Sequence, residues 1–225
     1  MVNLPLSFPS VAPNAIASYD YLDVANGTGL TDFYLMREGD SSLGYALQAA
    51  QTKTFSKEID MTGVYVYNGD VFHLSGSAPQ TFSLGAFNLP RNVKGRALVQ
   101  GSYELSGGSS QVLIKQVFCL TKNGVEFASG STQQASATAG SFSSGSIVLP
   151  ITISAVTHFA RDDVLGVKYY VLGKTTGGAG ETSGVKTTIG ISPLDENGSV
   201  LTPSTNPGET TITKISIPFR LDDVA

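Results

Sequence analysis

The stretch SQVLIKQVFCLTKNGVEFASG, residues 110–130, decides the fold class. A long apolar run meets the turn Lys122-Asn123-Gly124 and returns through Val125 and Phe127. An Asn-Gly pair permits the positive φ angles of a two-residue type I′ turn, so the stretch predicts two antiparallel strands joined by a tight hairpin. Cys119 falls in the first strand and is expected to be a buried strand residue. Because it is the only cysteine, no intrachain disulfide can form.

The same two-residue period of apolar side chains recurs along most of the chain. A second hairpin is predicted over 62–76, around Asn68-Gly69. Further strands are predicted at 31–38, 43–50, 80–87, 96–105, 145–154, 163–173, 184–192 and 210–219. Only residues 43–53, LGYALQAAQTK, have a composition that also favours a helix. Many short strands separated by Gly, Ser, Asn and Pro predict an all-β, jelly-roll-like antiparallel β-sandwich, with 156–166 as a turn-rich crossover between its sheets.

The domain organisation expected is an extended N-terminal arm, residues 1–15, followed by one β-sandwich domain, residues 16–225. Pro5, Pro9 and Pro13 fix φ and remove hydrogen-bond donors, which favours an extended tether over a regular strand. The first residues lack the charged and apolar regions of a secretory signal. No stretch approaches the length of a membrane span, so membrane insertion is not expected.

The charge of the chain is low for a soluble domain. Charged residues make up 14% of the sequence, against about 25% in typical domains, and the net charge is −4. Lys and Arg are scattered, which argues against a nucleic-acid partner. A polar surface with few charges suits a chain that is partly buried against copies of itself or against neighbours.

Residues 173–180, GKTTGGAG, contain the Gly-Lys-Thr triplet of a phosphate-binding loop. The first glycine of that motif is replaced by Lys168, and the glycines that follow Thr175 disfavour the helix that would hold phosphate. The stretch is therefore predicted to be a hairpin tip joining two of the last strands. No cofactor is expected.

Catalytic and metal-binding patterns are sparse. The chain has two histidines and no G-x-S-x-G elbow, so a hydrolase would have to use His158 with Asp162 or Asp163. Residues 193–199, PLDENGS, offer oxygen ligands but lack the alternating pattern of a calcium loop, which favours a solvated turn. Neither a catalytic nor a metal-binding residue is assigned.

Two segments, 16–36 (IASYDYLDVANGTGLTDFYLM) and 162–193, resemble parts of β-rich jelly-roll virion proteins of tailed bacteriophages. The second has a lead strand, a Gly-rich hairpin and an exit through Pro193. The resemblance implies an oligomeric jelly-roll protein mounted on a capsid or tail, made in the host cytoplasm and located in the virion.

The expected function is that of a non-enzymatic structural protein of a virus particle: a capsid decoration, cement or head-fibre subunit. Its partners would be copies of itself and neighbouring capsid or tail proteins. The alternative is a tail protein that binds a host receptor or glycan through the tips at 173–184 and 130–146. The residues expected to contact partners are Pro5, Pro9, Pro13, Lys174, Thr175 and Glu181.

Overall fold

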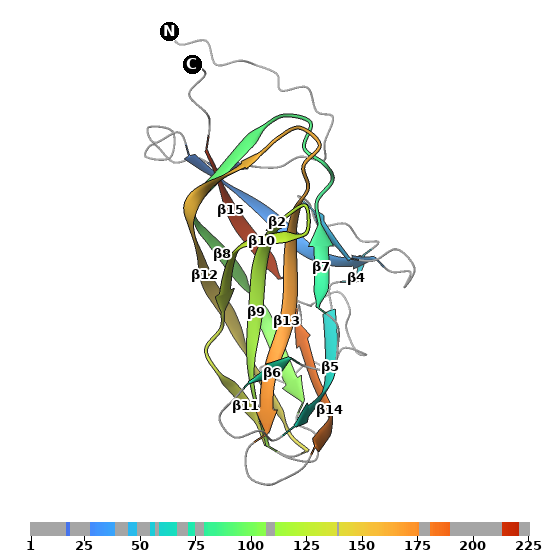
Figure 1. Ribbon diagram of the computed structural model, residues 1–225. Helices are drawn as coiled ribbons and strands as arrows, with labels where there is room; N and C mark the ends of the chain where they lie inside the picture. The colour runs from blue at the N-terminus through green and yellow to red at the C-terminus, as the bar shows by residue number, and fades with distance from the viewer. Residues whose placement is uncertain are drawn as a thin grey trace.

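The structure is a computed structural model that describes residues 17–18, 28–38, 45–48, 55–56, 59–66, 72–74, 79–106, 111–138, 140–175, 181–189 and 213–220. The described residues form strands and contain no helix (Figure 1). The strands are β1 (Ala17–Ser18), β2 (Thr28–Glu38), β3 (Tyr45–Gln48), β4 (Phe55–Ser56), β5 (Ile59–Val66), β6 (His73–Leu74), β7 (Gln80–Ser83), β8 (Arg91–Ser106), β9 (Val112–Lys122), β10 (Val125–Ser131), β11 (Ala135–Ala137), β12 (Phe142–Phe159), β13 (Leu165–Thr175), β14 (Glu181–Ile189) and β15 (Lys214–Arg220).

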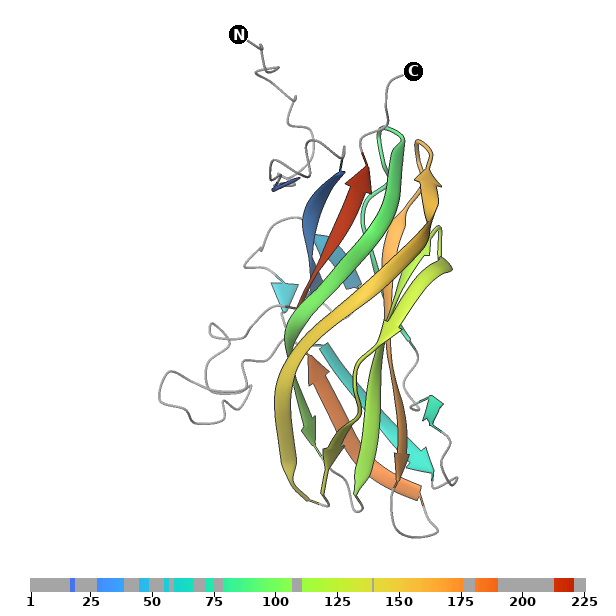
Figure 2. The same cartoon turned by 90° about the vertical axis from the view of Figure 1, so that its left-hand side faces the viewer.

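These strands make an elongated two-layered sandwich (Figures 1 and 2). One layer has the order β10-β9-β13-β7, with β11 on β9 and β6 on β13. The other has the order β3-β2-β15-β8-β14-β5, with β12 on β8 and β1 and β4 on β2. One parallel bridge, Ala46 to Ser83, joins the layers, and the remaining pairings are antiparallel. The predicted all-β antiparallel sandwich is confirmed.

The interior is filled by alternate side chains from both layers. Along β13 the buried side chains Leu165, Val167, Tyr169 and Val171 alternate with partly exposed ones, as expected for a strand with one covered face. On β12, Ile147, Ile151 and Ile153 point inward in the same way. This period of two residues is the pattern from which the fold class was predicted.

The hairpin predicted at 110–130 is confirmed. β9 and β10 pair antiparallel from Lys122 and Val125 outward, and Asn123 and Gly124 have φ angles of 50° and 80°. Both angles are positive, as a type I′ turn requires. A β-bulge between Glu126 and Ala128 then bends β10 toward the second layer.

Contact between β10 and β12 closes this side of the sandwich. A Cβ built on Gly130 would lie 3.1 Å from Ile151 Cγ1 and 3.4 Å from the carbonyl oxygen of Pro150. Because glycine lacks that atom, the backbone of β10 can approach β12 closely without being hydrogen-bonded to it in a ladder.

The hairpin predicted at 62–76 is wrong. β5 pairs with β14, whereas β6 pairs with β13 in the other layer. Asn68-Gly69 lies outside the described residues. The long β5–β14 ladder satisfies the backbone of β5 over most of its length, which a hairpin with the two-residue β6 could not do.

Three other predicted segments have different boundaries or connections. Residues 45–48 form strand β3, so the helical alternative for 43–53 is not adopted there. The crossover between layers is confirmed but narrower, because β12 runs to Phe159 and β13 begins at Leu165. The hairpin predicted around 173–180 is wrong: residues 173–175 end β13, and β14 pairs with β5 and β8 in the other layer rather than with β13.

Candidate functional site

The corner between β12 and β13 is held by one carboxylate, that of Asp163. It accepts hydrogen bonds from Asn123 Nδ2 at 2.6 Å and from the backbone N–H of Ala160 at 2.7 Å. It also forms an ion pair with Lys122 Nζ at 3.0 Å. Asn123 in turn accepts a hydrogen bond from the N–H of Val164 through Oδ1, at 2.8 Å. The β9–β10 turn and the 160–164 corner are thereby fastened to each other.

This donor set lowers the pKa of Asp163 to about 2, chiefly through the hydrogen bond from Asn123 and then through Lys122 and the backbone of Ala160. A carboxylate that is held in its charged form in this way suits a structural role, because a general acid or base needs a pKa nearer the working pH.

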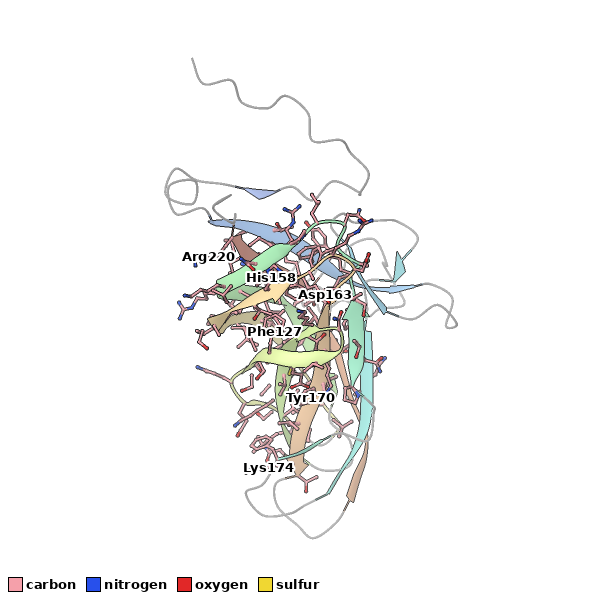
Figure 3. All side chains as sticks on the ribbon, turned by 45° about the horizontal axis from the view of Figure 1, so that its top comes forward. Phe127, His158, Asp163, Tyr170, Lys174 and Arg220 are labelled. Carbon is pink, nitrogen blue, oxygen red and sulfur yellow. The ribbon has the colours of Figure 1, made fainter. Side chains whose placement is uncertain are left out.

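His158 does not pair with either candidate aspartate. Its Nδ1 lies 2.7 Å from Oδ1 of Asn92, across the β8–β12 ladder, while its backbone carbonyl accepts a hydrogen bond from Lys122 at 2.7 Å. Asp162 has a positive φ of 71° and donates its N–H to the carbonyl of Phe87. Figure 3 shows His158 and Asp163 at the same end of the molecule. Their hydrogen bonds, however, do not form the His–Asp pair of a catalytic triad.

A row of phenylalanine rings lies beneath this corner. The ring centroids are separated by 5.9 Å for Phe127–Phe159, 5.3 Å for Phe159–Phe87, 6.1 Å for Phe87–Phe219 and 6.2 Å for Phe219–Phe33. The row crosses from one layer to the other in edge-to-face contacts, the geometry that aromatic pairs prefer. Lys122 Nζ lies 5.7 Å from the Phe159 centroid, so the same lysine holds both the corner and the top of this row.

A second polar group lies on the outer face of β9, β10 and β13. Lys168 Nζ lies 2.7 Å from Glu126 Oε1, and the hydroxyl of Tyr170 lies 4.0 Å from Cys119 Sγ. Burial first, and then the neighbouring Cys119, raise the pKa of Tyr170 to about 12. Burial also raises the pKa of the Cys119 thiol. A buried thiol with a raised pKa is a poor nucleophile, which agrees with its expected role as a strand residue.

Lower on the same face, two lysines meet one aromatic ring. Lys115 Nζ lies 4.6 Å and Lys174 Nζ 5.1 Å from the centroid of Phe72. Sequence reasoning singled out Lys174 but missed Phe72 and Lys115. The registers of β9 and of β6 on β13, which the sequence does not reveal, bring these three residues together.

The outer side of β12 has a different character. This strand of 18 residues contains no Asp, Glu, Lys or Arg. Val148 is 70% exposed and Val156 47% exposed, although both are large apolar side chains. The sequence predicted a strand at residues 145–154 and a crossover between the sheets at residues 156–166, so this segment was split between two elements. The uninterrupted lack of charge from 142 to 159 was nevertheless visible in the sequence.

The other predicted contact residues have varied surroundings. Pro5, Pro9 and Pro13, the arm of residues 1–15 and the segment 193–199 lie outside the described residues. Glu181 begins β14 opposite Val66. Thr175 is buried, and its hydroxyl has no hydrogen-bond partner within the part of the chain that the structure describes. A role in partner contact remains a prediction for all six residues.

Within the described ranges, no three His, Cys, Asp or Glu side chains gather in a way that could hold a metal ion. The same ranges include no helix of the length and apolarity needed to cross a membrane.

Comparison with known proteins gives similarity of structure only. Neither a protein-family model nor a curated protein matches the sequence. A CocE/NonD family hydrolase from Staphylococcus aureus is 11% identical, with a TM-score of 0.45 over 85% of this chain and 37% of that one. An aminopeptidase from a marine sediment Thaumarchaeota archaeon is 10% identical, with a TM-score of 0.43 over 86% and 37%. The VP2 subviral particle of infectious bursal disease virus is 13% identical, with a TM-score of 0.32 over 86% and 47%.

This chain therefore spans less than half the length of each of these proteins. The likeness to VP2 concerns the β fold alone, and the resemblance to virion proteins of tailed bacteriophages remains a prediction. The prediction that the chain is not an enzyme is contradicted, because the neighbours include a hydrolase and an aminopeptidase. That prediction is withdrawn. At these identities the likeness concerns the fold, so no activity of those enzymes is transferred to this chain.

Proposed function

We propose that the chain is a structural subunit of a virus particle that assembles with copies of itself and with neighbouring particle proteins. The observation that carries the proposal is strand β12, whose 18 residues contain no charged side chain. Among the described residues it is hydrogen-bonded in a ladder to β8 alone, so it ends that sheet, and β10 contacts it only by packing near Pro150 and Ile151. Long edges without charge are templates for association, and proteins that stay monomeric usually guard them with charged residues.

The outward side chains of β12 suit a protein interface. Val148, Pro150 and Thr152 point away from the core, while the residues between them are buried. Pro150 lies opposite Leu98 of β8 and removes one backbone donor from the strand, so contact through the face is favoured over a full added ladder. The absence of charged side chains from this strand agrees with the depletion of charge in the central part of a protein interface.

The particular role we propose is that of a capsid decoration, cement or head-fibre subunit. In this role sheet faces pack between copies, and the arm of residues 1–15 reaches a neighbouring subunit. The low overall charge of 14% supports such a role, because much of the surface would be covered in the particle.

The test uses two valines with nearly equal exposure. Val148 is 70% exposed on β12, and Val125 is 71% exposed at the β9–β10 turn. Analytical ultracentrifugation of the purified chain is expected to show a concentration-dependent oligomer. Val148→Lys should weaken its association by about tenfold or more, because the lysine would be desolvated in the interface.

Val125→Lys is the matched control and should leave the association constant unchanged. If the wild-type chain stays monomeric at high concentration, the proposal that copies of the chain associate through β12 is wrong. Equal weakening by both variants would show that net charge, rather than this face, governs association.

A further inference from the structure

The turn between β9 and β10 contains an Asn-Gly pair, the dipeptide in which asparagine loses its side-chain amide most readily. The sequence has four such pairs, at 26–27, 68–69, 123–124 and 197–198, and only the third lies within the residues that the structure describes. Asn123 and Gly124 are both exposed, so water reaches them. Because glycine has no side chain, the nitrogen of Gly124 is the least hindered nucleophile that can follow an asparagine.

Deamidation of this pair needs only the two residues and water. The backbone nitrogen of Gly124 attacks Cγ of Asn123, the Cγ–Nδ2 bond breaks, and ammonia leaves with the proton of the attacking nitrogen. The product is a cyclic succinimide. Water then opens the ring at one of its two carbonyl carbons, which gives either aspartate or isoaspartate, in which the chain continues through the former side chain. Each product carries a carboxylate in place of the amide, and neither returns to asparagine.

In the folded protein, three hydrogen bonds hold Asn123 to the corner of residues 160–164. Its backbone N–H donates to the carbonyl oxygen of Val164 at 2.9 Å. Its Nδ2 donates to Oδ1 of Asp163, the residue labelled in Figure 3, at 2.6 Å. Its Oδ1 accepts from the N–H of Val164 at 2.8 Å. Cγ is bonded to both of these side-chain atoms, so it cannot swing toward Gly124 unless both side-chain hydrogen bonds break.

The backbone of the turn opposes the reaction as well. Ring closure brings Cβ of Asn123 and the nitrogen of Gly124 to the same side of the bond between Cα and the carbonyl carbon. In a type I′ turn they lie on nearly opposite sides of that bond. The φ angles of 50° and 80° at this turn are those of the type I′ form, so the peptide between the two residues must rotate before attack. We therefore expect deamidation from an opened corner and not from the closed one.

Deamidation would turn the contact with Asp163 from attraction into repulsion. The donor Nδ2 is replaced by a carboxylate oxygen, which only accepts, across the present distance of 2.6 Å from Asp163 Oδ1. Lys122 can neutralise only one of the two carboxylates. Its Nζ already lies 3.0 Å from Asp163 Oδ2 and donates to the carbonyl oxygen of His158 at 2.7 Å. The products would therefore weaken the link between the turn and the corner.

We propose that Asn123-Gly124 is a deamidation site that the closed corner protects, and that its modification releases the β9–β10 hairpin from residues 160–164. Local opening of the corner exposes the site. Because the products do not revert, the modified fraction grows with the time that the corner spends open. The hydrogen bonds of Asp163 thus set the chemical lifetime of this end of the sandwich. This site does not involve the outer face of β12.

Peptide mapping by chromatography and mass spectrometry measures deamidation at Asn123 while the purified chain is stored at mildly alkaline pH. The rate in the folded wild type should be at least about tenfold below that of the same chain unfolded in urea, the effect of one charge-assisted hydrogen bond. Asp163→Ala removes the acceptor of Nδ2 and should raise the folded rate about tenfold. Asp162→Asn removes the adjacent carboxylate, suits the φ of 71° at that position, and should leave the wild-type rate unchanged. Thermal unfolding fixes a storage temperature at which every variant is folded.

Asn123→Asp introduces the product charge directly. Hydrogen exchange of the backbone N–H at position 123, which bonds the carbonyl oxygen of Val164, reports whether the turn stays docked. Its protection should fall about tenfold in Asn123→Asp. The double variant Asn123→Asp with Asp163→Asn exchanges donor and acceptor and leaves a single carboxylate beside Lys122. It should therefore recover most of the lost protection.

Three results would overturn the proposal. The first is a folded wild type that deamidates at Asn123 as fast as the chain in urea, which would mean that the corner gives no protection. The second is an Asp163→Ala rate no higher than that of Asp162→Asn. The third is unchanged protection in Asn123→Asp, or no recovery in the double variant, which would show that repulsion does not release the hairpin. None of these results bears on the ultracentrifugation of the β12 variants.

Discussion

The two ends of the sandwich interior differ in their aromatic content and in the hydrogen bonding of their buried polar atoms. At the corner end, near residues 160–164, five phenylalanines form a continuous row beneath the Asp163 hydrogen bonds. At the opposite end, where β13 finishes and β14 begins, the buried side chains include Thr175 and Thr187. Their hydroxyls have no hydrogen-bond partner among the described residues. One end is therefore held by apolar packing and matched charges, while the other buries polar atoms at a cost.

This difference between the two ends indicates which contacts contribute most to the stability of the folded protein. Edge-to-face contacts between aromatic rings stabilise the folded protein beyond the free energy gained by burying the surface of the rings. A buried hydroxyl without a partner loses its hydrogen bonds to water and gains nothing in return. We therefore expect substitutions at the corner end to destabilise the protein more than substitutions of the buried threonines, in the following order.

The largest effect is expected at Phe159. This side chain is fully buried, and its ring contacts those of Phe87 and Phe127. Phe159→Ala would leave a cavity between the layers and lower the free energy of unfolding by about 3–5 kcal/mol, measured by chemical denaturation. Val125→Ala, at an exposed apolar position, should change it by less than about 0.5 kcal/mol. A loss at Phe159 no larger than that control would mean that the aromatic row does not stabilise this end.

The next effect is expected at Gly166, where β13 passes between β9 and β7. An added Cβ would lie 2.5 Å from Thr121 Oγ1 and 3.1 Å from the backbone oxygen of Phe82. Gly166→Ala should therefore cost about 1–3 kcal/mol of unfolding free energy through overpacking. Gly85→Ala is the matched control, because a Cβ there meets nothing within 4 Å. If Gly166→Ala is no more destabilising than Gly85→Ala, the neighbouring strands β9 and β7 of the same layer can shift to accommodate the added methyl group.

A third, pH-dependent effect is expected at Asp163. Its pKa is about 2 in the folded protein, below the ordinary value of 3.8. A lowered carboxyl pKa contributes stability above the unfolded pKa, and this contribution is lost as the pH falls through the folded pKa. The thermal midpoint of the wild type should fall between pH 4 and 2, and Asp163→Asn should reduce that dependence. Asp162→Asn removes the adjacent carboxylate as a control and should retain the wild-type profile.

Much of the fold could be predicted from the sequence where the pattern is local. The alternation in 110–130 and the Asn123-Gly124 pair fix a strand–turn–strand unit, because the turn needs only neighbouring residues. The same dipeptide signal failed at Asn68-Gly69, where β5 and β6 pair with distant strands. A turn dipeptide makes a hairpin favourable but does not decide which strands finally pair.

The candidate sites were harder to predict from the sequence than the strands, because their residues meet only through the register of strands that are distant in the chain. Lys115 and Lys174 are 59 positions apart in numbering and become neighbours only through the β9–β13 ladder. Asp163 was placed in the predicted crossover 156–166, but its partners Lys122 and Asn123 lie in the distant β9–β10 hairpin. The uncharged β12, by contrast, could have been found directly, because absence of charge is a local property of the sequence.

The smallest effect is expected for the buried threonine at the opposite end. Thr187→Val replaces the hydroxyl with a methyl group of similar size, so no cavity forms and an unmatched polar atom is removed. The free energy of unfolding should change by less than about 0.5 kcal/mol or rise slightly. Thr132→Val is the control, because Thr132 Oγ1 accepts a hydrogen bond from the N–H of Gln116 at 3.0 Å. Its loss should cost about 1 kcal/mol. If Thr187→Val is the more destabilising of the two in chemical denaturation, the hydroxyl of Thr187 makes a favourable interaction, and the contrast between the two ends fails.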